Sequence, residues 1–354
     1  MAYTNINKSK EHFNTVTYAG DGNSPRSITG VGFQPDFTWI KNRTNDTKSH
    51  VLANVIQGYG TNGTTLKSDS TDAQGNSAST GRLRDPGATT DGFTVGDSSF
   101  TNESSTNIVA WNWKANGTGS SNTDGSITST VSANTTSGFS IVSWTGTGAN
   151  ATVGHGLGVA PKIVIIKNRD RASGWHVGGD AIGTDNQYLN LNGTDAIGSA
   201  GTGFQSFSST TFGIGSDTDW NASSESIIAY CFAEKTGYSK FGSYTGNGNA
   251  DGNFIYTGFK PAFLIVKRYD AGGYFWHMYD NKRSSSGGSN IIDDVLYPQN
   301  NHAEYSGDKL DFVSNGIKYR SANGDINGSG GSYIYMAFAE APLVGTNNVP
   351  CTAR

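Results

Sequence analysis

Short apolar runs bounded by turn residues recur along the chain and predict β-strands. The clearest are DFTWIK (36–41), KIVIIK (162–167) and AFLIVK (262–267), which are rich in Val, Ile, Phe and Trp. Each directly follows a proline, which is tolerated at a strand entrance because it needs no ladder partner there. KIVIIK is apolar at every inner position, so we expect its strand to be covered on both faces. We expect the lysine that ends each run to place its ammonium in water.

Helical patterns are nearly absent from the sequence. No segment keeps an apolar stripe at i, i+3, i+4 and i+7 beyond two turns, and NIIDDVLYP (290–298) is the best candidate for a short helix. The predicted fold class is therefore all-β, built from antiparallel β-sandwiches.

The apolar runs belong to a longer pattern that occurs three times in the same order. Each copy opens with an aromatic strand and a glycine turn, reaches its proline, and has a lysine six residues later. A histidine follows that lysine, at His50, His176 and His277, and a related strand closes the copy. The pattern predicts three tandem antiparallel β-sandwich repeats of jelly-roll or lectin-like type, about 100 residues each.

The pattern also predicts the domain boundaries. The segment between the first two copies is rich in Gly, Ser, Asn and Thr, which indicates a linker, with SITSTVSA (126–133) as a candidate edge strand. We therefore expect the second and third repeats to pack as a rigid pair and the first to lie on a longer tether. The predicted order is an N-terminal arm (1–12), repeat 1 (13–115), the linker (116–138), repeat 2 (139–235), repeat 3 (239–341) and a C-terminal tail (342–354).

Composition narrows the class of protein. Hydrophobic residues make up 34% and charged residues 15% of the chain, so small polar residues supply most of its polarity, as in proteins with many turns. The net charge of -4 and the lack of a Lys/Arg run argue against nucleic acid as a partner. The chain has only two cysteines, no recognisable signal peptide and no apolar run of membrane-spanning length. We expect a soluble protein without a disulfide framework or membrane insertion.

Two of the recurring histidines follow a tryptophan, as Trp175-His176 and Trp276-His277, whereas His50 follows a serine. An aromatic ring beside an imidazole could stack on a sugar and hydrogen-bond its hydroxyls, which makes these four residues a candidate glycan-binding site. Alternatively, each pair belongs to the next strand of the sandwich, with its two side chains on opposite faces.

The recurring basic residues and the acidic loops each allow two interpretations. The lysine of each copy, with its neighbouring arginine, could bind an anion, or it could end the strand and form ion pairs. The loops SDTDWN (216–221) and NGDINGS (323–329) alternate oxygen-bearing side chains as calcium loops do, but Asx-turns explain them equally well. Asn-x-Ser/Thr triplets such as Asn221-Ala222-Ser223 are expected by chance in so Asn- and Ser-rich a chain. The basic residues are Lys41, Arg43, Lys167, Arg169, Lys267 and Arg268.

Sequence templates for enzymes are absent. The chain contains no GxSxG elbow, no HExxH motif and no Walker loop, and no two of its 29 acidic residues stand out as a glycosidase pair. We therefore expect no enzyme activity, no catalytic residues, no metal ion and no cofactor.

Several longer strings resemble one known family. MAYTNINKSKEHFNTVTYAGDG (1–22), GFQPDFTWIKNR (32–43), WNWKANG (111–117) and YIYMAFAEAPLVGTNNVPCTAR (333–354) are similar to virion structural proteins of tailed bacteriophages of marine bacteria, often described as tail-fibre or lectin-like surface proteins. The resemblance covers nearly the whole chain and carries no binding residue with it. It implies a component of the virion surface, assembled in the host cytoplasm with other capsid or tail proteins. It also implies a homo-oligomer, since phage fibres are usually trimers.

The prediction for function is a bacteriophage virion structural protein on the particle surface, either a tail fibre, a short spike or a capsid-decorating protein. Its predicted role is in assembly and host attachment. The alternatives are a glycan-binding module that acts as the receptor-binding protein, and a polysaccharide depolymerase.

Overall fold

The chain is nearly all β in this computed structural model, which confirms the predicted fold class. Within the described residues the helical elements are two single turns, η1 (Ser9–Glu11) and α1 (Thr218–Asn221). The predicted C-terminal tail lies outside the described residues except for its first four positions and residue 349. The structure describes residues 3–58, 64–76, 83–84, 90–183, 185–284, 290–345 and 349.

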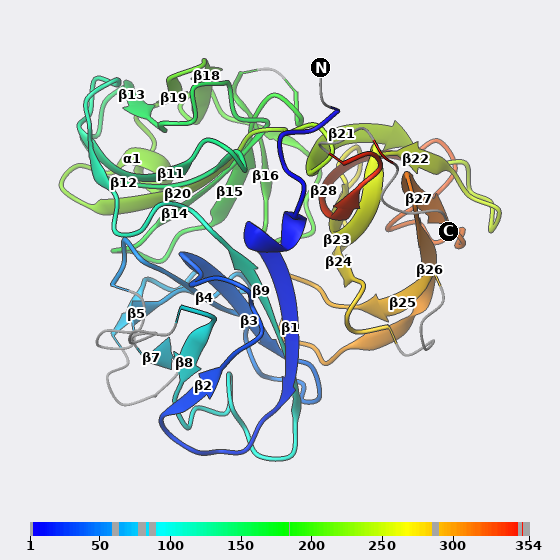
Figure 1. The fold of residues 1–354 in the computed structure, drawn as a ribbon. Coiled ribbons are helices and arrows are strands. Elements are labelled where there is room, and N and C mark those ends of the chain that lie inside the picture. Colours follow the sequence, from blue (N-terminus) through cyan, green and yellow to red (C-terminus); the bar gives the residue numbers. More distant parts are fainter. Residues whose placement is uncertain are drawn as a thin grey trace.

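Three antiparallel sheets share one strand order, and we call the units that contain them repeats 1, 2 and 3 (Figure 1). In each of these inner sheets, the last strand of the repeat lies between the first strand and the strand of the apolar run that ends in lysine. Across the sheet the strands are β1 (Phe13–Ala19), β9 (Asn107–Trp113), β3 (Phe37–Asn42) and β4 (Val51–Asn54) in repeat 1; β12 (Phe139–Thr145), β20 (Ser226–Phe232), β14 (Ile163–Asn168) and β15 (Trp175–Gly178) in repeat 2; and β21 (Ser239–Thr245), β28 (Ser332–Pro342), β23 (Phe259–Arg268) and β24 (Trp276–Asp280) in repeat 3.

An outer sheet covers one face of each inner sheet and completes a sandwich around its own apolar core. The outer sheets are β2 (Arg26–Ile28), β8 (Phe93–Val95) and β7 (Leu83–Arg84) in repeat 1; β13 (Ala151–Gly154), β19 (Thr211–Ile214) and β18 (Phe204–Phe207) in repeat 2; and β22 (Phe254–Tyr256), β27 (Gly316–Tyr319), β26 (Tyr305–Val313) and β25 (Ile291–Val295) in repeat 3. Two further pairs are the hairpin of β5 (Thr64–Thr65) and β6 (Gly75–Asn76), and β16 (Gln187–Asn190) with β17 (Gly198–Ser199) beside β15.

The segment 116–138, expected as a linker, is part of the inner sheet of repeat 2. It contains β10 (Ser120–Asn122) and β11 (Ser129–Asn134), and β11 pairs with β12. The candidate strand at 126–133 overlaps β11. The free edge of β12 offers main-chain donors and acceptors to any extended segment, so a polar sequence can form a strand there. Repeat 1 is therefore not held on a loose tether.

The helix expected within 290–298 is also wrong, because β25 occupies this segment and pairs with β26. Ile292 and Val295 both face the core of repeat 3. Their spacing of three residues fits one face of a helix, and in a regular strand it would place them on opposite faces. A register shift between Ile292 and Asp294 turns both inward.

The inner sheets pack against one another and bury a shared central core. In β14, Ile163 and Ile165 face this central core, whereas Val164 and Ile166 face the sandwich core of repeat 2. Strands β3 and β23 divide their apolar residues between the two cores in the same way. The expectation that KIVIIK (162–167) is covered on both faces is confirmed.

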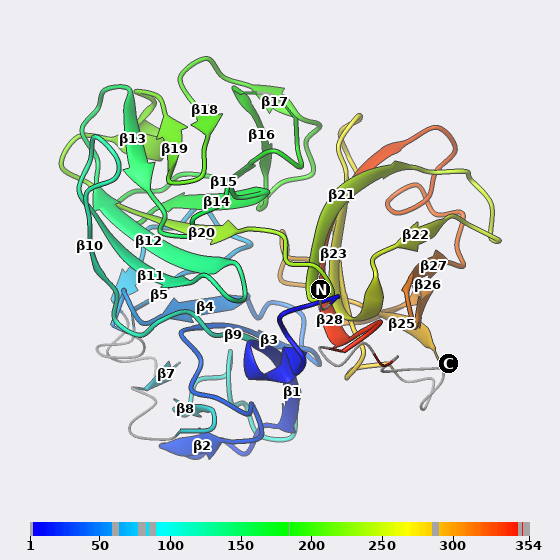
Figure 2. The ribbon, with the colours of Figure 1, turned by 45° about the horizontal axis from the view of Figure 1, so that its top comes forward.

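Aromatic rings from all three repeats meet in the central core. Phe37 of repeat 1 stacks on Tyr230 of repeat 2 with centroids 4.3 Å apart, and Phe13 stacks on Phe338 of repeat 3 at 5.3 Å. Phe232 of repeat 2 lies 5.9 Å from the same Phe338. Each repeat thus touches both others, and Figure 2 shows them as three lobes around a common centre. Contacts of this kind close into a ring after three units.

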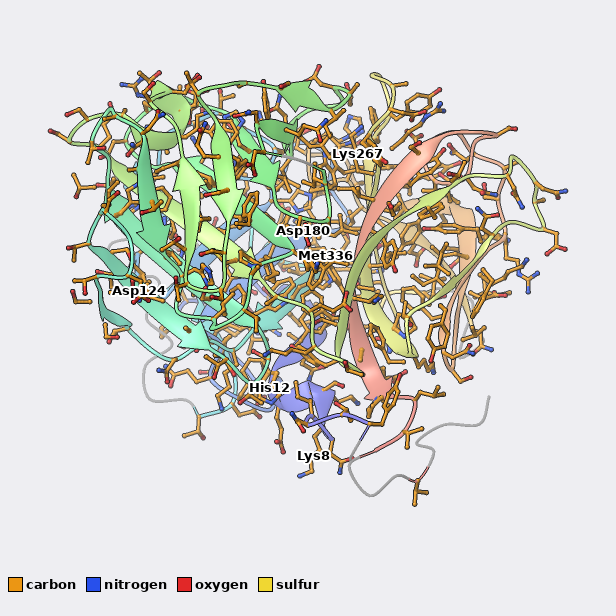
Figure 3. The ribbon with its side chains drawn as sticks, turned by 90° about the horizontal axis from the view of Figure 1, so that it is seen from above. Lys8, His12, Asp124, Asp180, Lys267 and Met336 are labelled. Atoms are coloured by element: carbon orange, nitrogen blue, oxygen red, sulfur yellow. The ribbon has the colours of Figure 1, made fainter. Side chains whose placement is uncertain are left out.

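The N-terminal arm packs on the repeats. Ile6 is buried in the central core, and the hydroxyl of Tyr3 donates to the carbonyl of Gly258 at 2.8 Å. The carbonyl of His12 accepts a hydrogen bond from the main-chain N–H of Lys114, directly after β9, at 2.9 Å. Figure 3 shows side chains filling the space between the lobes, with Met336 near the middle and His12 near the edge.

Candidate functional site

The four residues predicted as a glycan-binding site are buried in the sandwiches. Trp175, His176, Trp276 and His277 are between 0% and 6% exposed. Both tryptophans face the central core. His176 faces the other way, where its ring stacks on Trp220 at 4.3 Å. The two side chains of a pair lie on opposite faces of one strand, and none of the four offers an open surface to a sugar.

The histidine of repeat 1 does not occupy the same place as the other two. In repeat 2 the residue before the strand-ending lysine, Ile166, pairs with His176. In repeat 1 the corresponding residue, Ile40, pairs with Val51. His50 therefore takes the position of Trp175, one residue earlier in the strand. The similar spacing from lysine to histidine in the sequence hid this shift.

The ring N–H at this shared position crosses to another repeat in every case. The bonds run from Trp175 Nε1 to Lys67 O (2.7 Å), from Trp276 Nε1 to Asn190 O (2.9 Å) and from His50 Nε2 to Tyr297 O (3.0 Å). Trp39 Nε1 donates to His50 Nδ1 at 2.8 Å, so the proton of the neutral imidazole lies on Nε2. Burial lowers the pKa of His50 well below its ordinary value and keeps the ring neutral.

The strand-ending lysines do not reach water, which corrects the expectation from the sequence. Lys41, Lys167 and Lys267 are all 0% exposed, and burial lowers the pKa of each to about 8. Each ammonium donates to at least one carbonyl of its own repeat and to one carbonyl of another repeat. The acceptors in the other repeats are Asn301 for Lys41 (3.3 Å), Thr71 for Lys167 (3.2 Å) and Thr194 for Lys267 (3.4 Å).

Charged side chains reinforce the junction between repeats 1 and 3. Arg43 Nε lies 2.9 and 3.0 Å from the two carboxylate oxygens of Glu304, which also pairs with buried Arg283. Arg283 in turn pairs with Asp280, whose Oδ2 accepts from Trp111 Nε1 of repeat 1 at 2.8 Å. The ion-pairing interpretation holds for Arg43.

Main-chain hydrogen bonds cross the three junctions at matching places. The residues beyond the strand-ending lysines supply the carbonyls, and extended loops of other repeats supply the N–H groups. The bonds run from Gln74 N to Arg169 O (2.7 Å), from Ile197 N to Tyr269 O (2.8 Å) and from Glu304 N to Arg43 O (2.9 Å). With the lysines and ring donors, they make each junction a polar clamp around the apolar centre.

Three Asn-x-Ser triplets have a structural role that chance does not explain. Asn102, Asn221 and Asn327 begin such triplets and are each 0% exposed. The side chain of each accepts from a main-chain N–H of the glycine turn after the first strand and donates back into the same turn. The accepted bonds come from Asp21 N (3.1 Å), Thr147 N (3.0 Å) and Asn247 N (3.0 Å).

The acidic loops form Asx-turns. Asp217 Oδ1 accepts from Asp219 N at 2.9 Å, and Asn323 Oδ1 accepts from Asp325 N at 2.7 Å. Among the described residues, no three His, Cys, Asp or Glu side chains gather closely enough to hold a metal ion. The same part of the chain contains no helix with the length and apolar character needed to cross a bilayer.

Outward aromatic side chains distinguish repeat 3. Phe254 and Tyr256 of β22 are 47% and 54% exposed, while Ile255 between them packs against the core of repeat 3. Figures 1 and 2 place β22 on the side of repeat 3 away from the other repeats. The sequence pattern does not reveal this feature, because all three residues are apolar. Strand alternation alone does not say which of them face water.

Comparison with known families places the chain in one of them. A model described as a domain of unknown function, DUF7483, matches residues 8–342. The chain belongs to the DUF7483 family. The match spans all three repeats, so the family is defined by the whole three-repeat unit rather than by one sandwich. No curated protein and no solved structure matches the chain. The resemblance to virion proteins stays a prediction.

Proposed function

We propose that this DUF7483 protein is a non-catalytic structural component of the bacteriophage particle surface, with a role in assembly and host attachment. The observation that carries the proposal is the set of polar clamps that join three sandwiches around one core. A repeat in such a body cannot open without exposing the shared core, which disfavours local unfolding and proteolysis. The strings that resemble virion proteins support the same proposal.

The trimer usual for phage fibres has a counterpart within this chain. One side of each repeat meets a different side of the next, and such heterologous contacts close into a ring after three units. We therefore infer that the central core needs no second chain. Size-exclusion chromatography with light scattering should give the monomer mass of 37.3 kDa. Association of three chains through the central core would contradict this inference.

The place of the protein on a particle is the decisive test of the proposed function. Labelled antibodies or density from electron cryomicroscopy should locate a three-lobed body on the head, neck or tail of purified particles. Absence of the protein from purified particles, measured by mass spectrometry, would overturn the proposal. Release of reducing ends from the host envelope polysaccharide would instead favour a depolymerase.

A further inference from the structure

The three outer sheets differ in what their first strands present to water. Ser27 of β2 and Thr152 of β13 lie next to the inward-facing residues of those strands and pair with Thr94 and Gly213. The corresponding strand of repeat 3, β22, presents Phe254 and Tyr256 instead. On one of three related faces a small polar side chain is thus replaced by the exposed ring of Phe254, and Tyr256 adds a second exposed ring two residues further along the strand.

One edge of the Phe254 ring lies against the neighbouring strand. A Cβ atom at Gly316, on the neighbouring strand β27, would stand 2.8 Å from Cε2 and 2.9 Å from Cζ of that ring. At this edge the ring therefore rests against main chain where no side chain intervenes, and Phe254 as a whole is 47% exposed. A ring held in this way forms a preformed platform, which lowers the entropy cost of binding.

Tyr256 continues the platform toward the N-terminal arm. Phe254 and Tyr256 are two residues apart in a strand, so their side chains leave the same face about 7 Å apart. Tyr256 interacts with the hydroxyl of Tyr3, and burial together with this hydrogen bond raises the pKa of Tyr3 to about 12. The Tyr3 hydroxyl stays protonated at neutral pH.

Charged groups border the other end of the platform. Lys318 pairs with Phe254 across the strands, and its ammonium lies 2.8 Å from Asp251, whose side chain is 78% exposed. Arg320, with its side chain 48% exposed, pairs with Asp311 at 2.7 Å. The platform therefore has two aromatic rings in the middle and hydrogen-bonding groups at both ends.

We propose that this face of β22 and β27 binds an oligosaccharide chain, with sugar rings stacked on Phe254 and Tyr256 and hydroxyls bonded to the groups at the ends. The exposed apolar part consists of two rings, whereas a stable protein interface buries about 800 Å² on each partner. Rigid rings with polar neighbours suit an amphipathic ligand, because they give contact area at low entropy cost. The inference does not depend on where the protein sits on a particle.

Glycan-array binding and titration calorimetry with purified host envelope polysaccharide test this site on the full chain. We expect Phe254→Ala and Tyr256→Ala each to weaken binding about tenfold, since a stacked ring contributes on the order of one decade in affinity. Tyr305→Ala is the matched control, because Tyr305 is 53% exposed on β26 and lies outside the platform. Its affinity should equal that of the unmodified chain.

Three results would overturn the proposal. The first is no binding of the unmodified chain to any glycan on the array or to the polysaccharide. The second is unchanged affinity in the double Phe254→Ala, Tyr256→Ala variant. The third is binding of a protein partner, and of no glycan, that is lost in the same variant. Unfolding midpoints measured alongside should match in all variants, since these side chains are exposed.

Discussion

The junctions between the repeats and the outward faces of the repeats differ in how closely the three units match. At each junction a buried lysine and a buried ring N–H donate to carbonyls of another repeat. On the outward faces, Ser27 and Thr152 of two repeats occupy the position of the exposed ring of Phe254 in the third. A buried donor or ring must have hydrogen-bond partners and must also fill the available volume. A side chain in water is under neither constraint. Differences between repeats therefore carry information about binding mainly at the outward faces.

The largest expected effect tests whether the junctions make one body of three repeats. Trp113 is 1% exposed, and its ring meets rings of all three repeats in the central core. Trp113→Ala should cost about 3–5 kcal/mol of unfolding free energy. The whole chain should still unfold in a single transition, with its midpoint at a lower temperature. Differential scanning calorimetry measures this. Loss of repeat 1 alone, with two sandwiches melting as before, would show that the repeats are independent.

The polar part of a junction should contribute less than its core. Lys167→Met keeps most of the side-chain volume but leaves the carbonyls of Thr71 and Ser173 without their ammonium donor. We expect a loss of about 2 kcal/mol, measured by urea unfolding. Lys309→Met, at an exposed lysine of repeat 3, is the control and should change stability by less than about 0.5 kcal/mol. Equal losses of stability in the two variants would show that the hydrogen bonds of Lys167 do not stabilise the junction.

The buried asparagines allow a test within a single triplet. Asn221→Ala removes the bonds to Thr147 and Ala149 and should cost about 1–2 kcal/mol. Ser223→Ala removes the same Asn-x-Ser triplet but changes an exposed side chain, so stability should not change. Chemical denaturation of both variants separates the two roles. Equal stability of the two would contradict a structural role for Asn221.

A pH dependence of the junctions tests all three buried lysines together. The lysine pKa values of about 8 in the folded state lie below the ordinary value of 10.5, so the unfolded chain binds more protons between these values. Unfolding free energy should therefore rise from about pH 8 to pH 10, by up to about 1.4 kcal/mol per pH unit for each of the three lysines. Above pH 10 it should fall, because burial raises the pKa of tyrosines such as Tyr230 in the folded state.

Urea midpoints at several pH values measure this rise. The triple change of Lys41, Lys167 and Lys267 to Met should abolish the rise and keep the fall above pH 10, since the tyrosines remain. A flat profile in the unmodified chain would mean that the folded lysines titrate as they do in water.

The strands were predictable because their signals are local. Proline entrances and apolar runs located β3 and β14, and the run KIVIIK (162–167) indicated a strand buried on both faces. The apolar run also located β23, but Pro261 lies inside that strand, at its register shifts, and not at its entrance. The bulge in β25 was not predictable. Ile292 and Val295 are three residues apart, and this spacing is the same for two residues on one helix face and for two residues on either side of a register shift in a strand. The edge strands in 116–138 were largely hidden, because their pairing depends on the main chain of β12 rather than on their own side chains.

For the candidate sites, the sequence showed which residues recur but not whether those residues are exposed or buried. The four Trp and His residues proposed to meet a sugar are buried, and the pair that faces water, Phe254 and Tyr256, lies in an ordinary apolar triplet. Exposure is a property of the assembled sheets. A strand residue faces water only if no other layer covers its side, and the sequence of one strand does not contain that information.

The sequence by itself determined that the chain is all β, where its main strands begin, and that one pattern occurs three times. Periodicity, proline and glycine act over a few residues, so these features survive in any arrangement of the repeats. Only the tertiary structure decided that the ammonium groups of Lys41, Lys167 and Lys267 are buried and bonded to main-chain carbonyls rather than to water. One carbonyl at each lysine comes from a loop of another repeat. That loop lies there only because the three repeats pack their large apolar faces against one another and so remove them from water.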